Sequence, residues 1–147
     1  MTDCIFCKIV AGEIPSFKVY EDENHSAFLD INPNTHGQTV LVTKKHYPSY
    51  AFELSEDVYV PLMRAAKMVA RLLDEKLGVT RTVLVAEGMG VNHAHLKLYP
   101  LHGIEAREFG EAPKRVYFEN YPGYTTTRRG PEADSGELEK LAAKISE

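Results

Sequence analysis

Residues 90–100 read GVNHAHLKLYP and alternate polar with apolar side chains. In a β-strand successive side chains point to opposite faces of the sheet. One face of the predicted strand would carry three nitrogen-bearing side chains, His93, His95 and Lys97. The other face would carry the core residues Ala94, Leu96 and Leu98. This pattern is common in half-buried strands, but two neighbouring imidazoles also favour proton transfer or metal binding near neutral pH.

Length and charge limit the kinds of protein that the chain can be. It has 147 residues, of which 44% are hydrophobic, and we predict a single domain over residues 1–147. The formal net charge of −4 gives no general attraction to nucleic acid or to an anionic membrane. The sequence has no apolar run that could span a bilayer and no signal-peptide pattern at its start. We expect a cytoplasmic protein that binds neither nucleic acid nor membranes.

Five segments rich in strand-forming residues predict a sheet: residues 16–22, 25–31, 37–43, 82–86 and 93–99. The first three read as an antiparallel meander, and the glycine-bearing EGMG reads as a tight connection before the last. The fold class is therefore α+β, a five-stranded antiparallel sheet with one long helix packed on it and a C-terminal helix.

The long helix is predicted from apolar residues that recur every three or four positions between Leu62 and Leu77. Gly78 would end it. Ser55 would cap its start, whereas Pro61 would kink it or mark a later start. For the C-terminal helix, Asp134 and Glu137 are spaced as a capping box.

The only cysteines, Cys4 and Cys7, are separated by two residues, so both thiolates can reach one tetrahedral ion. Zinc then needs two more ligands, and His46 and His93 are best placed if the third and fifth strands end near one another. The remaining histidines are interpreted as surface residues: His25, His36 and His102. The alternatives for the cysteines are a small buried apolar pair and a redox pair.

His95 is the candidate for a second kind of chemistry. A neutral imidazole can act as a nucleophile or a general base if an acceptor holds its other nitrogen and fixes the tautomer. Lys97 on the same face would offer an ammonium to a phosphate group. The alternative is a row of solvated charges.

The chain resembles the histidine-triad (HIT) proteins, and in particular their zinc-containing bacterial branch, in two segments: CIFCKIVAGEIPSFKVYEDENHSAFLDINPNTHGQTVLVTKKHYPS and VNHAHLKLYP. The family consists of nucleotide-binding hydrolases and transferases. Residues 1–100 are assigned to this resemblance, and residues 101–147 form an unmatched C-terminal extension. Aromatic and arginine residues in the extension could cover a nucleotide, although aromatic residues near proline and glycine more often form small packing clusters: Arg115, Tyr117, Phe118, Tyr121, Tyr124, Arg128 and Arg129.

The resemblance implies an activity and its residues. The central triad histidine, here His95, attacks the α-phosphorus of a nucleotide and forms a covalent nucleotidyl-histidine, which water then resolves. Asp30 matches the acidic residue that holds the ribose, and Phe28 and Ile31 match the walls of the base pocket. The implied substrates are purine nucleoside phosphoramidates, mixed anhydrides or dinucleoside polyphosphates.

The resemblance also implies a structural zinc ion and a homodimer. The zinc ligands of the family fall on the four residues that the ligand spacing favours: Cys4, Cys7, His46 and His93. Because all four positions would be filled by the protein, the ion would support the fold and hold His93 beside the nucleophile.

Two departures from the family pattern suggest a second hypothesis. Lys97 replaces the third triad histidine, and the loop EGMGVNH lacks the glutamine and serine that many members place before the triad. Asn92 is the candidate to replace them at the phosphate. The alternative function is a zinc-stabilised nucleotide-binding module with little or no catalysis. A redox protein that uses Cys4 and Cys7 is a third hypothesis.

Overall fold

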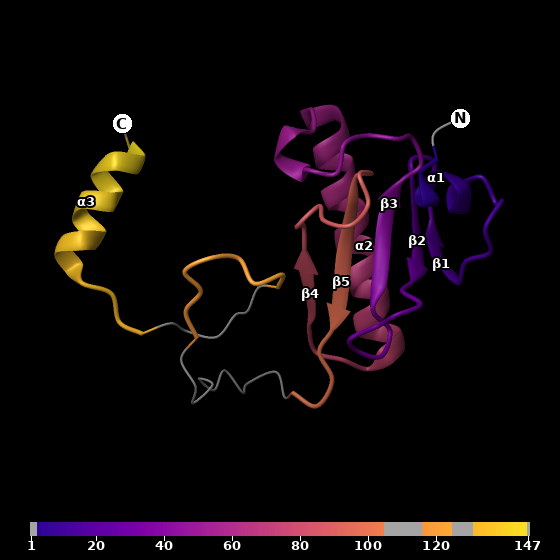
Figure 1. Ribbon diagram of the computed structural model, residues 1–147. Helices are drawn as coiled ribbons and strands as arrows, with labels where there is room; N and C mark the ends of the chain where they lie inside the picture. The colour runs from indigo at the N-terminus through magenta and orange to yellow at the C-terminus, as the bar shows by residue number, and fades with distance from the viewer. Residues whose placement is uncertain (1–2, 105–115, 125–130, 147) are drawn as a thin grey trace. The chain divides into compact units, whose positions relative to one another are not determined.

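The computed structural model of the protein describes residues 3–104, 116–124 and 131–146 (Figure 1). The chain divides into two compact units, Met1–Ala106 and Arg107–Glu147. The first unit contains the sheet, the four predicted metal ligands, His95 and the other predicted site residues up to Lys97, whereas the aromatic and arginine candidates of the extension belong to the second unit. None of the helices in the described ranges combines the length and the apolar character needed to cross a membrane.

Five strands form one antiparallel sheet in the order β1-β2-β3-β5-β4 (Figure 1). Their bounds are β1 Lys18–Glu21, β2 His25–Leu29, β3 Thr39–Thr43, β4 Thr82–Val85 and β5 His95–Pro100. The first three strands form the predicted meander, and β5 lies between β3 and β4. The predicted α+β fold with its five-stranded antiparallel sheet is confirmed.

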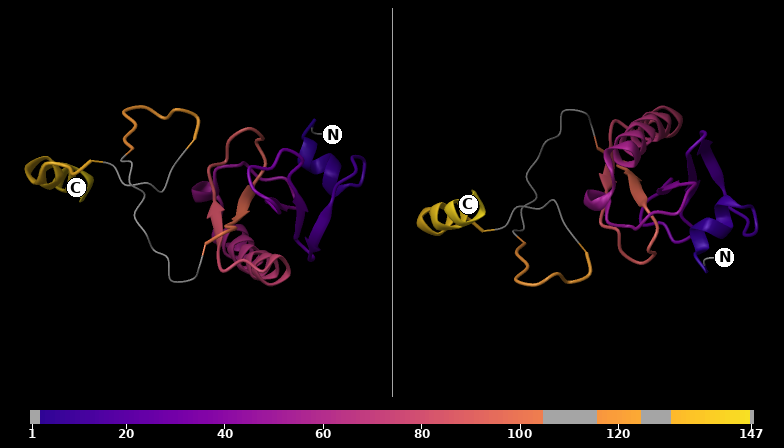
Figure 2. Two further views of the ribbon diagram at one scale, coloured as in Figure 1. Left: turned by 90° about the horizontal axis from the view of Figure 1, so that it is seen from below. Right: turned by 90° about the horizontal axis from the view of Figure 1, so that it is seen from above.

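Helix α2, Glu56–Leu77, lies along one face of the sheet (Figure 2). It ends at Gly78, which has the left-handed conformation predicted for it (φ 64°). The helix begins before Pro61, which removes only the hydrogen bond to the carbonyl of the exposed Asp57. Ser55 occupies the N-cap position, but its side chain makes no capping hydrogen bond, so that predicted role is wrong.

Alternate residues of the strands enter cores on opposite faces of the sheet. The core under α2 includes Ala27, Leu41, Leu62, Ala66, Val69, Leu73, Leu96 and Leu98. The opposite face carries a smaller cluster of Phe28, Val40 and Val42, against which residues of helix α1 (Ile5–Val10) pack. This short helix was not predicted, because six residues give too little of a helical repeat to recognise.

The start of β5 differs from the prediction. Strand pairing begins at His95, not at His93. The His93 N–H bonds to the Val91 carbonyl, and the Ala94 N–H bonds to the Tyr47 carbonyl. These bonds take His93 out of the ladder, so the connection from β4 is longer than the tight turn predicted from EGMG.

In the second unit, helix α3 spans Ser135–Ser146. Asp134 Oδ1 accepts a hydrogen bond from the Glu137 N–H at 3.0 Å, which confirms that half of the predicted capping box. The Glu137 carboxylate accepts a bond from Lys140 at 2.7 Å. Three arginines considered for nucleotide binding lie outside the described residues: Arg115, Arg128 and Arg129.

Replacing Leu96 by alanine should lower the free energy of unfolding by about 2–5 kcal/mol, because the fully buried side chain would leave a cavity under α2. Denaturant unfolding followed by circular dichroism measures the loss. The matched control is Met68→Ala on α2, whose side chain is 57% exposed, with an expected effect below about 0.5 kcal/mol. Equal losses in the two variants would contradict this account of the core.

Candidate functional site

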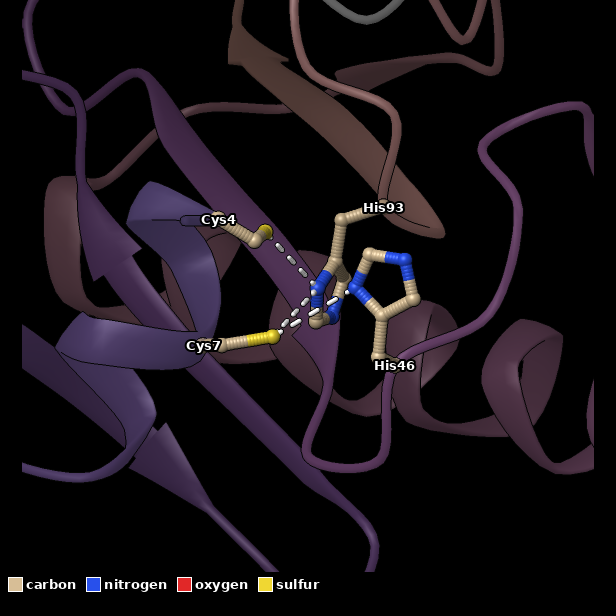
Figure 3. Close-up of side chains that lie close together, drawn as sticks. All are labelled: Cys4, Cys7, His46 and His93. Atoms are coloured by element: carbon tan, nitrogen blue, oxygen red, sulfur yellow. Dashed lines mark hydrogen bonds between the residues drawn. The ribbon is translucent and has the colours of Figure 1, made fainter. Parts of the chain in front are cut away.

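Four side chains from distant parts of the sequence converge on one point: Cys4, Cys7, His46 and His93 (Figure 3). Cys4 is the N-cap residue of α1 and Cys7 lies in its first turn, which places both sulfur atoms at the same end of the helix. His46 follows β3, and His93 precedes its neighbour β5. The structure therefore brings together the four residues predicted as metal ligands.

The geometry of this cluster suits a tetrahedral metal ion. Its four ligand atoms lie within 4.8 Å of one another. The His93 Nδ1 atom is 3.4 Å from Cys4 Sγ and 3.5 Å from Cys7 Sγ, and His46 Nδ1 is 3.4 Å from Cys7 Sγ. Zinc bonds of about 2.3 Å to sulfur and about 2.0 Å to nitrogen place tetrahedral ligands about 3.5 Å apart. The cluster could hold a metal ion of this kind.

A hydrogen bond fixes how His93 faces the sulfur atoms. Its Nε2–H donates to the Thr43 carbonyl at 2.7 Å, so Nδ1 carries the lone pair and points at the cysteines. The imidazole is fully buried, and burial lowers its pKa, which favours the neutral form. A neutral, oriented imidazole is the form in which histidine binds a metal.

The backbone of His93 orients the second histidine. The His95 Nδ1–H donates to the His93 carbonyl at 2.6 Å, which leaves Nε2 as the nitrogen with a free lone pair. Burial lowers the pKa of His95, and the charge of Lys97 lowers it further, although the bond to the His93 carbonyl opposes them. At neutral pH this arrangement favours an uncharged imidazole with one nucleophilic nitrogen.

His95 lines a cavity of about 320 Å³ on the α1 side of the sheet. Four other predicted ligand-binding residues line it as well: Phe28, Asp30, Ile31 and Lys97. Helix α1 contributes Ile5, Phe6 and Ile9. Asn92 is not among the lining residues, and its Oδ1 accepts a hydrogen bond from the Ser49 N–H at 3.1 Å.

Asp30 is held in place by a residue that the sequence analysis did not single out. Its Oδ2 accepts a hydrogen bond from Gln38 Nε2 at 2.8 Å, and its Oδ1 accepts one from the Asn32 N–H at 2.8 Å. Gln38 is itself buried, and its Oε1 accepts a bond from the Asn34 N–H. The carboxylate is therefore fixed at the edge of the cavity.

Lys97 is paired with Glu87, a second residue that the sequence analysis missed. The Lys97 Nζ and Glu87 Oε1 atoms are 2.5 Å apart, and about a quarter of each side chain is exposed. Burial acts to lower the pKa of Lys97, but the hydrogen bond and charge of Glu87 outweigh it, so the pKa is raised. The ammonium is therefore kept, with a carboxylate beside it.

The connection that carries Glu87 is pinned to the segment after β3. Gly88 has a φ of +68°, and a Cβ atom there would lie 2.7 Å from the Ser49 carbonyl oxygen. The Asn92 side chain bonds to the Ser49 backbone, and the Ala94 N–H bonds to the Tyr47 carbonyl. Close approach at Gly88 thus sets the position of its neighbour Glu87.

The surface position expected for His25 is wrong. His25 is buried, and its Nδ1 lies 3.0 Å from Asp22 Oδ1. The Asp22 carboxylate also accepts hydrogen bonds from the N–H groups of Asn24 and His25. His25 is the first residue of β2 and follows the turn that Asp22 holds, whereas His36 and His102 are exposed as expected.

A larger cavity, of about 520 Å³, lies beside α2 and shares Asp30 and Gln38 with the site. Its lining is mostly aliphatic and includes Leu72, Leu73 and Leu77, but neither His95 nor Lys97. We place the candidate site in the smaller cavity because the oriented imidazole and the ammonium meet there.

Comparison with known proteins gives consistent matches. The family model of the HIT domain matches residues 11–103. An uncharacterised HIT-like protein of Methanocaldococcus jannaschii is 41% identical over 115 residues, which cover 74% of this chain and 88% of that protein. The adenosine 5′-monophosphoramidase of Saccharomyces cerevisiae is 37% identical over 101 residues, 66% of this chain and 61% of that protein.

A solved structure also resembles the chain. It is that of a zinc-bound histidine-triad family protein from Mycobacterium smegmatis, with a TM-score of 0.63 and 26% identity. The match covers 98% of this chain and 96% of that one.

Replacing Gly88 by alanine should destabilise the protein more than replacing Gly90 by alanine. Both glycines lie in the same connection and have a positive φ, but only at Gly88 would the added Cβ atom meet a neighbouring atom. A Cβ at Gly90 meets nothing within 4 Å, so strain alone should cost about 1 kcal/mol. The contact with Ser49 should add about 1–3 kcal/mol at Gly88. Thermal unfolding of both variants tests this, and similar losses would show that the close approach is unimportant.

Proposed function

Because this chain belongs to the histidine-triad (HIT) family, we propose that it is a nucleotide hydrolase or nucleotidyl transferase acting through a covalent nucleotidyl-histidine at His95. The substrates would be nucleoside phosphoramidates, mixed anhydrides or dinucleoside polyphosphates, with a purine as the base. The observation that carries the proposal is the hydrogen bond from His95 Nδ1–H to the His93 carbonyl, which leaves Nε2 free beside a cavity that also contains Asp30 and Lys97.

The proposed reaction has two displacements at phosphorus. His95 Nε2 attacks the α-phosphorus, the bond to the leaving group breaks, and its electron pair departs with that group. The imidazole of the intermediate is cationic, and the His93 carbonyl stabilises it by accepting the Nδ1 proton in a hydrogen bond. Water then attacks phosphorus and releases a proton to solvent, and the electron pair of the P–N bond returns to Nε2. A leaving amine takes up one proton from solvent as it departs, so the protons balance over the two steps.

Binding would position the nucleotide for this attack. Asp30, oriented by Gln38, would accept hydrogen bonds from the ribose hydroxyls, and Phe28 and Ile31 would contact the base. Lys97 would face the phosphate, at the position of the third triad histidine. Since these groups are held by the sheet and by α1, positioning would supply much of the rate.

We also propose that the cluster of Cys4, Cys7, His46 and His93 holds a structural zinc ion. The donor set is the soft sulfur and nitrogen set that zinc prefers, and four protein ligands leave no open position. The ion would fix His93, whose carbonyl orients His95, and so would link the fold to the reactive nitrogen.

The second candidate function is a zinc-stabilised nucleotide-binding module. One observation favours it: the Lys97 ammonium is already paired with Glu87, so it would stabilise the negative charge of a transition state less than an unpaired ammonium would. Such a protein would bind nucleotides without forming a covalent intermediate.

A cytoplasmic homodimer remains part of the proposal. The strand order leaves β1 and β4 at the edges of the sheet, where unpaired backbone groups can be covered by another chain.

Replacing His95 by alanine should reduce turnover of an adenosine phosphoramidate by at least about a thousandfold, because no other described residue of the cavity offers an oriented imidazole. Intact-protein mass spectrometry after a rapid denaturing quench should detect a nucleotidyl adduct on the wild type alone. Unchanged melting temperature and zinc content in the variant serve as the control. Turnover without His95 would refute the mechanism, and binding without an adduct would favour the binding module.

Replacing His46 by alanine should weaken zinc binding by tenfold or more, about 1.4 kcal/mol, because one of four ligands is lost. Zinc content after dialysis against a chelator and the melting temperature should both fall. His36→Ala is the matched control, since His36 is also an exposed histidine but lies outside the cluster. Equal zinc retention by the two variants would contradict the proposed ligand set.

A further inference from the structure

The ammonium of Lys97, which lines the cavity, is paired with Glu87, a residue outside the described lining. The Lys97 Nζ and Glu87 Oε1 atoms are 2.5 Å apart, and the two side chains are buried to a similar degree, with 25% and 24% of their surface exposed. A partly buried pair of this kind is screened less by solvent than a surface pair. Each charge therefore largely cancels the field of the other in the cavity.

The carboxylate is placed there by the backbone. Val85, the last residue of β4, pairs with Lys97 of β5. Glu87 follows Val85 by two residues, in the connection that leaves β4. Gly88 then passes close to the Ser49 carbonyl, where an added Cβ atom would lie 2.7 Å from the oxygen. Glu87 is thus held beside Lys97 by the packing of the connection as well as by charge.

The other described residues of the cavity lining include no further lysine or arginine. Among the described residues that line it, Lys97 is the single cation and Asp30 the single carboxylate. The connection from β4 contributes only Met89, Gly90 and Val91 to the described lining.

We propose that Glu87 sets the charge selectivity of this cavity, so that it favours an α-phosphate with a single negative charge and an uncharged leaving group over polyphosphates. This inference rests on the proposed function and names the substrate class for the same site. A single negative charge can share the Lys97 ammonium with Glu87. Each further charge finds no cation among the described lining residues and is repelled by Glu87 and Asp30.

The physical consequence is a dependence of affinity on ligand charge. Removing the negative charge of Glu87 should strengthen binding by about threefold to thirtyfold for each negative charge on the ligand, depending on solvent screening. A ligand without charge should be unaffected. A role of Glu87 in folding alone would not produce this pattern.

The experiment is isothermal titration calorimetry at pH 7.5 with adenosine, AMP and ADP, on the wild type and on Glu87→Gln. Adenosine affinity should change by less than about twofold, whereas AMP affinity should rise and ADP affinity should rise further. Glu87→Asp keeps the charge and should keep the wild-type order of affinities. Glu75→Gln removes an exposed carboxylate of α2 and should leave all three affinities unchanged.

The outcomes separate this inference from the proposed function. If the wild type binds AMP but Glu87→Gln changes all three affinities by the same factor, or weakens AMP, the charge-selectivity inference is wrong and nucleotide binding stands. If the wild type binds none of the three ligands, the proposed function itself fails and the inference fails with it. Melting temperatures of the variants show whether each one is folded.

Discussion

The candidate site depends on the placement of one buried residue, His93. Its Nε2–H bonds to the Thr43 carbonyl, its Nδ1 points at Cys4 and Cys7, and its own carbonyl accepts the Nδ1 proton of His95. A shift of this residue would disturb the cluster of ligands and the tautomer of the candidate nucleophile together. The departure of His93 from the β5 ladder makes this possible, because a residue paired in the strand would have a different backbone direction.

The sheet places the remaining groups by register. Phe28, Val40, Lys97 and Val85 are partners across four neighbouring strands. Because paired residues share a face, this row puts an apolar surface next to an ammonium, and His95 lies one pleat further along β5. Helix α1 packs on the same face and closes one side of the cavity. The opposite face, covered by α2, carries the larger core, so alternate residues of one strand serve the site on one face and the larger core on the other.

The alternation of residues 93–99 predicted which side chains share a face, and the spacing of Cys4 and Cys7 predicted a site for two more ligands. Both predictions depend on local periodicity, which a sequence displays directly. The groups that orient these residues could not be found in this way. Thr43 acts through a backbone carbonyl that any residue would supply, and Glu87 reaches Lys97 only because of the register of β4 with β5. Burial of His25 likewise depends on a turn held by Asp22.

The ion pair between Glu87 and Lys97 changes what a lysine beside the candidate nucleophile His95 can do. An unpaired ammonium next to His95 would attract any anionic ligand. It would bind polyphosphates more tightly than monophosphates, because they carry more negative charge. A carboxylate at 2.5 Å reduces that preference while the ammonium remains a donor of directional hydrogen bonds. Lysine with a partner then differs from a histidine at the same position, because its charge does not change near neutral pH. Selectivity at this position would follow from the geometry of the connection that holds Glu87.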